Sequence, residues 1–418
     1  MLNKKLIQQD IDIWNLVEKE KTRQESCISL IASENYASSS VLEAQGSCLT
    51  NKYAEGYPGN RFYNGCKVID EIENIAIQRA KKLFNVDYVN VQPHSGSQAN
   101  FAVFQALLRP GDVILGMHLN HGGHLTHGSP VNFSGKIYQA YAYGVNKSGE
   151  IDYENLKNLS LLYRPRMIIG GFSSYSGICD WKYMRKIADQ VNAYFFVDIS
   201  HIVGLIIAGL YPNPLDYAHV VSTTTHKTFG GPRGGLIISR NKNQELYKKI
   251  NSAVFPGSQG GPLMHVIAAK AIVFKEAMHP DFLKLQKKVL LYAQIMVKIF
   301  LKRNFSVVSR KTNNHLLLID LSEKNITGKE ASDILAKSRI IVNKNAIPND
   351  TRKPFITSGI RIGTPAIARR NIDVKDVKQI TYWICDILND PHNSQQSKFI
   401  KTKIKEICKN YPIYNELT

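Results

Sequence analysis

Hydrophobic and polar positions along the chain predict strands that alternate with helices over its middle part. Residues 28–65, rich in Gly, Tyr, Asn and Ser, read as an arm of turns, and periodic apolar and polar segments begin near residue 70. Strands alternating with helices favour an α/β fold with a large, mostly parallel sheet flanked by helices. The expected helices are 69–83 and 98–108, and the expected strands are 88–91, 112–117, 167–170, 194–197 and 220–223.

The two ends of the chain carry different patterns. Residues 7–24 predict an amphipathic helix, whose apolar face consists of Ile7, Ile11, Trp14, Leu16 and Val17. Beyond residue 277 we expect a smaller α+β domain, with helices at 281–303 and 329–337 and strands at 306–309 and 316–321. The predicted division is an N-terminal helix and arm (1–50), a large domain (51–277) and a small C-terminal domain (278–418).

Composition and charge restrict the classes of protein that fit. The 418 residues are 44% hydrophobic and 21% charged, as in a soluble globular protein. The net charge is +19, from 53 basic and 34 acidic residues. Because the basic residues are scattered and many residues are Lys, Asn and Ile, we interpret the charge as compositional drift in an AT-rich genome. We therefore expect no nucleic-acid partner to be needed.

Cysteine usage and the apolar runs predict a cytoplasmic protein. The six cysteines lie far apart and none has C-x-x-C spacing, which indicates free thiols in a reducing compartment. The N-terminus has no secretory apolar region, and it carries acidic residues that a transit peptide lacks. The longest apolar run, 202–210, is too short to span a bilayer, so we expect no membrane association.

Lys227 carries the strongest chemical signal. It lies between the hydroxyl-rich run 222–225 and the glycine-rich turn 230–235, downstream of a predicted strand that ends at Asp198. A lysine that forms an imine needs a dry pocket and small neighbours, and pyridoxal phosphate needs an acid that keeps its pyridine nitrogen protonated. For these two residues alone, a surface lysine and an aspartate N-cap remain the more frequent alternative.

Two further motifs suggest ligand chemistry. Residues 95–97 (Ser-Gly-Ser) lie between a predicted strand and a predicted helix start, where free N–H groups suit a phosphate, although most such turns are only N-caps. His118, His121, His124 and His127 recur at every third position, which raises the possibility of zinc. Because glycines interrupt this run and no cysteine joins it, we expect no metal site.

Several longer segments resemble serine hydroxymethyltransferase, and most closely its bacterial form. They occur in the family's order from about residue 28 to residue 366, so the resemblance covers nearly the whole chain. The segments are 30–36 (LIASENY), 51–59 (NKYAEGYPG), 92–100 (QPHSGSQAN), 197–201 (VDISH), 222–228 (STTTHKT), 231–235 (GPRGG) and 358–364 (SGIRIGT).

The resemblance implies a pyridoxal-phosphate enzyme of fold type I, a homodimer whose subunits share their active sites. The catalytic residues that it implies are Lys227 (the imine), Asp198, His226, Glu55 and Tyr63. The implied cofactor-binding residues are Ser95, Gly96, Ser97, His124, Ser173, Asp198, His201, Thr224 and Lys227, with Tyr53, Gly260 and Gly261 from the neighbouring subunit. The implied substrate-binding residues are Ser33 and Arg361 for the amino acid, and Leu119, Gly123, His124, Leu125, Asn345, Lys353, Pro354 and Phe355 for the folate.

The reaction that the resemblance implies is the interconversion of serine and tetrahydrofolate with glycine, 5,10-methylenetetrahydrofolate and water. Such an enzyme supplies one-carbon units and glycine. A threonine-aldolase-like pyridoxal enzyme of the same fold is the alternative, and a binding protein without cofactor is a more distant one. The departures from the family pattern remove no residue with a chemical role. They are Ser200 for Ala, Phe229 and Gly230 for Leu and Ala, Phe62 for Tyr, and Asn64 and Ser258 for Gly.

Overall fold

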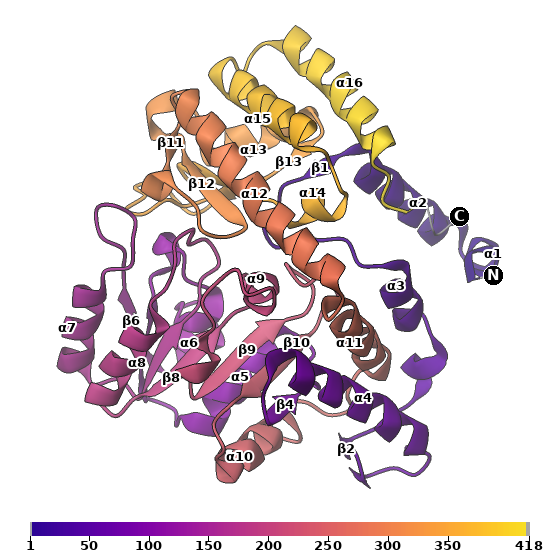
Figure 1. The fold of residues 1–418 in the computed structure, drawn as a ribbon, viewed down its shortest axis with the longest axis vertical. Coiled ribbons are helices and arrows are strands. Elements are labelled where there is room, and N and C mark those ends of the chain that lie inside the picture. Colours follow the sequence, from indigo (N-terminus) through magenta and orange to yellow (C-terminus); the bar gives the residue numbers. More distant parts are fainter. Residues whose placement is uncertain (1, 415–418) are drawn as a thin grey trace.

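A seven-stranded sheet forms the centre of the larger part of the fold (Figure 1). The structure is a computed structural model and describes residues 2–414. In spatial order the strands are β4 (Tyr88–Asn90), β10 (Gly235–Ser239), β9 (Val220–Thr224), β8 (Tyr194–Asp198), β7 (Met167–Gly170), β5 (Val113–Met117) and β6 (Gln139–Tyr143). β10 runs opposite to all the other strands of this sheet, which are parallel to one another. The predicted mostly parallel sheet is confirmed, and each predicted strand of it is present with its ends shifted by at most one residue.

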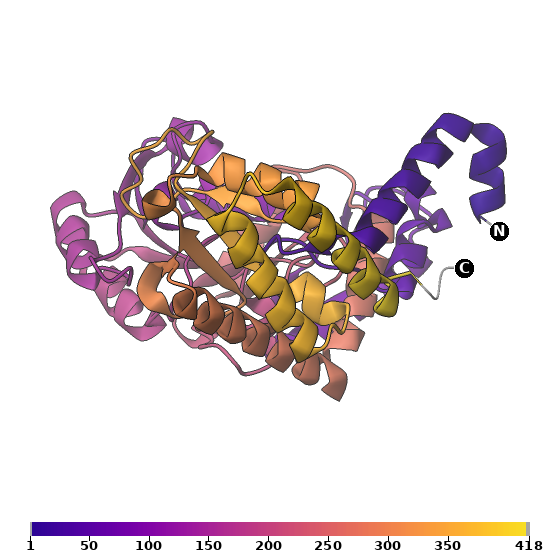
Figure 2. The ribbon, with the colours of Figure 1, turned by 90° about the horizontal axis from the view of Figure 1, so that it is seen from above.

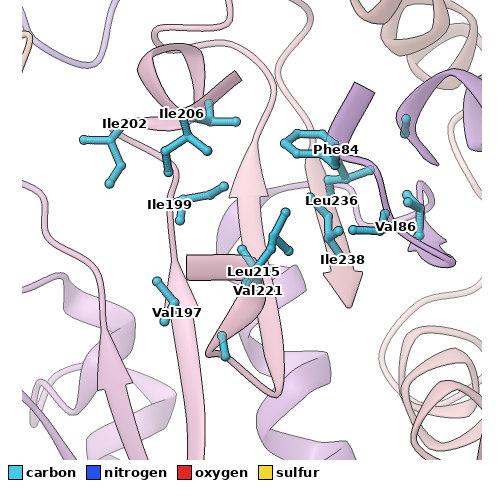
Figure 3. Close-up of a cluster of buried hydrophobic side chains, with 14 of the residues drawn as sticks. Phe84, Val86, Val197, Ile199, Ile202, Ile206, Leu215, Val221, Leu236 and Ile238 are labelled. Atoms are coloured by element: carbon cyan, nitrogen blue, oxygen red, sulfur yellow. The ribbon is translucent and has the colours of Figure 1, made fainter. Parts of the chain in front are cut away.

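Helices cover both faces of this sheet. They are α4 (Lys67–Phe84), α5 (Gly96–Leu107), α6 (Phe133–Ile137), α7 (Tyr153–Tyr163), α8 (Trp181–Gln190), α9 (Val203–Ile207), α10 (Gln244–Val254) and α11 (Met264–Ala277). Side chains alternate along β8: Phe195 and Val197 pack with α4, α8, α9 and α11, while Phe196 packs with α5 and α10. Figure 3 shows part of the first of these clusters, where Val197, Val221 and Leu236 project from neighbouring strands. Each large apolar side chain buried here stabilises the fold by about 1.5–3 kcal/mol.

The C-terminal part has a sheet and a core of its own, above the large sheet in Figure 1. Its antiparallel strands, in spatial order, are β11 (Ser306–Val307), β12 (Leu316–Asp320), β15 (Gly359–Gly363) and β14 (Asn343–Asn345). The helices are α12 (Pro280–Lys302), α13 (Gly328–Lys337), α14 (Pro365–Arg369), α15 (Val374–Asn389) and α16 (Ser394–Asn410). The predicted strand 306–309 ends early because Ser309 adopts a left-handed conformation, with φ 60°. The boundaries predicted at residues 50 and 277 stay a prediction.

The N-terminal segment begins with two helices that stand away from the rest of the molecule in Figure 2. The single helix expected over 7–24 is wrong: α1 (Leu2–Gln9) and α2 (Ile11–Ser26) are separated at Asp10, whose extended backbone and side chain cap α2. The predicted apolar face is not buried in this chain, and Leu16 is 58% exposed. None of the described helices combines the length and the apolar character that a membrane crossing requires.

The arm that follows is folded rather than a succession of turns. It contains β1 (Ile28–Ser29), which pairs in parallel with β13 (Ile340–Ile341), then α3 (Ser39–Gln45) and the hairpin β2 (Gly56–Tyr57) and β3 (Asn60–Arg61). The buried Arg61 guanidinium holds the hairpin in place. It donates to the carboxylates of Asp70 (2.8 Å) and Glu73 (2.6 Å) on α4, and to the carbonyls of Ala54 and Gly56 (2.9 Å each).

Removing the Arg61 guanidinium should destabilise the protein strongly. The Arg61→Met change leaves the Glu73 carboxylate, whose side chain is 1% exposed, without its cation. We expect the free energy of unfolding to fall by about 3–5 kcal/mol in urea titrations. Lys329→Met, which breaks an exposed ion pair with Asp333, is the control and should cost less than about 1 kcal/mol. Equal effects of the two changes would contradict the role given to Arg61.

Candidate active site

The parallel strands bring the predicted chemistry to one edge of the large sheet. Strands β5, β7, β8 and β9 point the same way, so the residues that follow them meet at their carboxyl ends, where open α/β sheets bind ligands. A cavity of about 410 Å³ lies there. It is lined by Ser33, Glu34, Ser95, Gly96, Ser97, His124, Ser173, Asp198, Ser200, His201, Thr224, His226, Lys227, Arg233 and Arg361.

Lys227 follows β9 and lines this cavity. Its carbonyl accepts hydrogen bonds from the Asn35 side chain (2.8 Å) and from the Gly230 N–H (3.0 Å), which fixes the peptide group that follows Lys227. Burial lowers the pKa of Lys227 to about 8, the Asp198 carboxylate raises it, and the Arg361 and Arg233 cations lower it further. More of the amine is therefore unprotonated and nucleophilic near neutral pH than in an exposed lysine.

Asp198, at the carboxyl end of β8, is a buried carboxylate with several donors. It accepts from the Asn100 amide (2.9 Å) and the Ser200 N–H (2.9 Å), and His127 Nε2 lies 3.4 Å from its Oδ2. Burial alone would raise the pKa of Asp198, but the close contact with His127 and the nearby His124 and Lys227 hold it well below its usual range. The carboxylate is therefore ionised, as a partner for a protonated ring nitrogen must be.

His124 lies beside this carboxylate in a defined tautomer. Its Nδ1 accepts from the Thr126 N–H (3.2 Å) and contacts the Thr126 hydroxyl at 2.7 Å, and that hydroxyl accepts from Asn100 (2.8 Å). The proton of the neutral ring therefore sits on Nε2. Burial lowers the pKa of His124 to about 4, so the ring is uncharged at neutral pH.

The histidine run 118–127 divides between two places. His118 Nδ1 accepts from the Asn120 N–H and His121 Nδ1 accepts from the Val145 N–H, away from the other two. The ligand atoms of His124, His127 and Asp198 lie within 4.8 Å of one another. These three residues belong to the surroundings of Asp198 described above, where His127 Nε2 lies 3.4 Å from the Asp198 carboxylate.

The turn 95–97 begins helix α5. Ser95 is the N-cap, and its hydroxyl accepts from the Gln98 N–H (3.2 Å). A β-carbon at Gly96 would approach Thr224 Cγ2 to 2.6 Å, so only glycine allows this close contact between the turn and β9. Ser200 Oγ, Thr224 Oγ1 and His226 Nδ1 are buried without a hydrogen-bond partner in residues 2–414. Unsatisfied polar groups in a cavity indicate a site for a polar ligand.

Arg361, on β15, reaches the cavity from the C-terminal sheet. It donates to the Asn343 side chain (3.1 Å) and to the Ser173 carbonyl (2.6 Å), and no carboxylate among the described residues forms an ion pair with it. Burial lowers the pKa of Arg361 to about 10, and the guanidinium remains charged at neutral pH. Its fork is available for an external carboxylate.

A row of hydrogen bonds, here called the polar seam, joins the C-terminal part to the large-sheet part around the cavity. Besides Arg361 to Ser173, it consists of His201 Nδ1 with His315 Nε2 (3.2 Å), Gln286 to the Thr228 carbonyl (2.9 Å), Asn313 N–H to the Ser176 carbonyl (2.8 Å) and Asn314 to the Tyr175 carbonyl (2.9 Å). Burial lowers the pKa of His201 well below its usual range, and lowers that of His315 to about 3. Both rings are therefore neutral.

The remaining predicted residues do not line the cavity of this chain. Tyr53, Glu55 and Tyr63 form a separate exposed cluster, in which Glu55 lies 3.4 Å from the Tyr53 hydroxyl and 3.3 Å from that of Tyr63. A β-carbon at Gly260 would approach Glu55 and one at Gly261 would approach Tyr53, so both glycines border the cluster. Leu119, Leu125, Asn345, Lys353, Pro354 and Phe355 lie elsewhere, Phe355 being 81% exposed, and Gly123 is buried against Met117.

Sequence reasoning missed several residues at this edge. Glu34, Ser200 and Arg233 line the cavity, although each lies inside a motif that we singled out. Asn100 and His127 hold Asp198, and Asn100 also accepts from the Ser222 hydroxyl (2.6 Å). A polar Asn within an apolar helix, and a histidine three residues after His124, were the available signals.

Comparisons with known proteins agree with this site. A family model described as serine hydroxymethyltransferase matches residues 6–384. The serine hydroxymethyltransferase of Buchnera aphidicola subsp. Cinara cedri is 74% identical over 417 residues, covering 100% of both chains. That of Blochmanniella pennsylvanica is 61% identical over 407 residues, covering 97% of this chain and 98% of the relative. The chain therefore belongs to the serine hydroxymethyltransferase family and is an enzyme of that family.

Proposed function

We propose that this chain transfers the hydroxymethyl carbon of serine to tetrahydrofolate, giving glycine, 5,10-methylenetetrahydrofolate and water, with pyridoxal phosphate bound at Lys227. The observation that carries the proposal is one cavity that holds a partly unprotonated lysine, a buried carboxylate and an arginine without a carboxylate partner. These are the groups that an aldehyde cofactor and an α-amino acid require.

The described residues fit pyridoxal phosphate. Lys227 would bind its aldehyde carbon, Asp198 its ring nitrogen and His124 the face of its ring. His201, Ser173 and Thr224 would border the phenolic oxygen and the ring, and residues 95–97 would hold the phosphate at the N-terminus of α5. The buried, unpartnered hydroxyl of Thr224 and ring nitrogen of His226 support this fit. When bound, the cofactor supplies an electron sink for the bond that breaks at the amino acid's α-carbon.

The chain's own groups would orient the amino acid and hold protons. Arg361, with Ser33 nearby, would bind the carboxylate through two parallel hydrogen bonds. The Asp198 charge would keep a proton on the ring nitrogen, and its fixed donors mean that little reorganisation is needed. Burial lowers the pKa of His226 to about 3, so the ring beside Lys227 is uncharged at neutral pH.

We infer that the cluster of Tyr53, Glu55, Tyr63, Gly260 and Gly261 completes the cavity of a second subunit. The cluster is exposed, and it lies outside the cavity of its own chain although the family resemblance assigns it to the site. A homodimer brings such a surface to the partner's cavity. The Glu55 carboxylate, which raises the pKa of Tyr63, would then move protons near the folate, whose pterin would contact Asn345 and residues 353–355. A cytoplasmic location stays a prediction.

A serine-cleavage assay with and without tetrahydrofolate tests the proposed reaction. We expect rapid formation of glycine from serine only when tetrahydrofolate is present, and a threonine-aldolase-like enzyme would instead cleave threonine without it.

The Arg361→Lys variant tests the proposed carboxylate site, because lysine keeps the positive charge but lacks the planar fork of the guanidinium. We expect it to bind pyridoxal phosphate normally, and to bind glycine roughly thirty-fold or more weakly. Unchanged glycine affinity would remove Arg361 from the site.

The lowered pKa of Lys227 predicts a specific pH dependence. In the protein without cofactor, reductive methylation of Lys227 should rise with pH to a midpoint near 8, as measured by peptide mass spectrometry. The Asp198→Asn variant is the matched control: because the carboxylate raises the pKa of Lys227, its loss should move the midpoint lower. A midpoint near 10.4, the value of an unperturbed lysine, would contradict the buried setting of Lys227.

Mixed dimers test the shared site. Lys227→Ala and Glu55→Gln should each be inactive, but a hybrid of the two carries one site with both changes and one with neither. Random mixing makes half of the dimers hybrids, so about one quarter of wild-type activity should return. Lys227→Ala mixed with Asp198→Asn is the control and should restore nothing, because these residues belong to the same cavity. No recovery in the first mixture would place Glu55 in its own chain's site.

A further inference from the structure

Lys270, on α11, is a fully buried lysine that the proposed reaction does not use. The residue is 1% exposed, and its Nζ donates to three backbone carbonyls, those of Val91 (2.6 Å), Pro93 (3.0 Å) and Gly235 (2.8 Å). An ammonium group has three N–H donors, so each of them has an acceptor. Burial lowers the pKa of Lys270 to about 7, with the Glu73 carboxylate opposing this shift, so the buried position is unfavourable for the charge.

The three carbonyls belong to the segments that shape the turn 95–97. Residues 91–94 connect β4 to this turn without forming a strand, so their backbone groups need other partners. Lys270 binds two of the carbonyls, and the Gln259 side chain binds the Gln92 carbonyl (3.1 Å) and the His94 N–H (3.0 Å). The Gly235 N–H donates to the Pro93 carbonyl (2.9 Å), which joins the segment to β10.

The packing around these groups leaves little room for movement. A β-carbon at Gly234 would approach Lys270 Cε to 2.4 Å, and one at Gly235 would approach the Ser95 carbonyl oxygen to 2.3 Å. On the other side of the turn, Gly96 packs against Thr224. We therefore expect a displacement of the Lys270 ammonium group to move Ser95, because Gly234 lies against Lys270 and Gly235 lies against the Ser95 carbonyl.

We infer that Lys270 is a positioning residue for the turn 95–97, which is proposed to bind the cofactor's phosphate. Its ammonium group holds this turn in place by donating to the carbonyls of Val91, Pro93 and Gly235. The inference rests on the proposed function. A helix N-terminus binds a phosphate through N–H groups whose positions are fixed before the ligand arrives, and preorganisation of this kind lowers the cost of binding. Lys270 supplies that fixation, and it does not contact the ligand itself.

Equilibrium binding of two ligands by the full-length protein separates positioning from general stabilisation. Pyridoxal phosphate and pyridoxal differ only in the phosphate, so a loosened turn weakens the first and not the second. We expect Lys270→Met to bind pyridoxal phosphate about tenfold or more weakly, with pyridoxal affinity changed less than about twofold. Arg79→Met is the matched control, because Arg79 donates to the Ala271 carbonyl (2.7 Å) on the same helix but not to the turn. It should leave both affinities unchanged.

Each outcome is decisive. Equal weakening of both ligands by Lys270→Met, or unchanged affinity for pyridoxal phosphate, overturns the inference and leaves the proposed function intact. If the wild-type protein binds neither ligand, the proposed function itself fails. Should Lys270→Met not fold, Gly234→Ala provides the same test, because the added methyl group displaces the lysine head while its charge is kept. That variant should lose affinity for pyridoxal phosphate selectively, and loss of both affinities or of neither would contradict the inference.

Discussion

The buried negative charge of Asp198 is the constraint to which the rest of the site is fitted. An unpaired carboxylate inside a protein is very unfavourable, so the chain must surround it with donors. Asn100 comes from α5, His127 from the loop after β5, and the Ser200 N–H from the residues that follow β8. Asn100 is held in turn by Ser222 on β9. Satisfying one charge therefore fixes the relative positions of several strands and of the helix that begins at the phosphate turn.

Much of the large sheet could be predicted because its strands are short apolar runs between amphipathic helices. β10 and β6 were not predicted. β6 has exposed and half-buried side chains that resemble those of a loop, and β10 is a short buried run that pairs both with β9, just before it, and with β4, about 150 residues earlier. The break at Asp10 was missed because an aspartate also fits the polar face of a continuous helix. Local pattern therefore found most of the buried strands, but it gave no signal for a strand with exposed side chains or for a helix break at a polar position.

The site divides in the same way. Residues inside long motifs, such as Lys227, Asp198, Arg361 and the turn 95–97, line one cavity as expected. The partners that set their properties lie far away along the chain: Asn100 from Asp198, His315 from His201, and Lys270 from the turn. No sequence spacing encodes these contacts, because only the folded chain brings the segments together, within the large-sheet part for Asn100 and Lys270 and across the two parts for His315. The sequence thus identifies the reacting groups more readily than the groups that tune them.

The polar seam has a mechanical consequence. Two cores that share apolar surface cannot slide without exposing it to water, whereas hydrogen bonds across a boundary can be exchanged for water at a small net cost. The large-sheet core carries Lys227 and the C-terminal core carries Arg361, so the seam sets the gap between the groups proposed to grip the two ends of an amino acid. The distance between these two groups therefore depends on how the two parts of the fold are placed relative to each other. The width of the gap depends on the hydrogen bonds of the seam together with helix α12, whose Phe282 packs in the large-sheet core while its Val289 and Tyr292 pack in the C-terminal core.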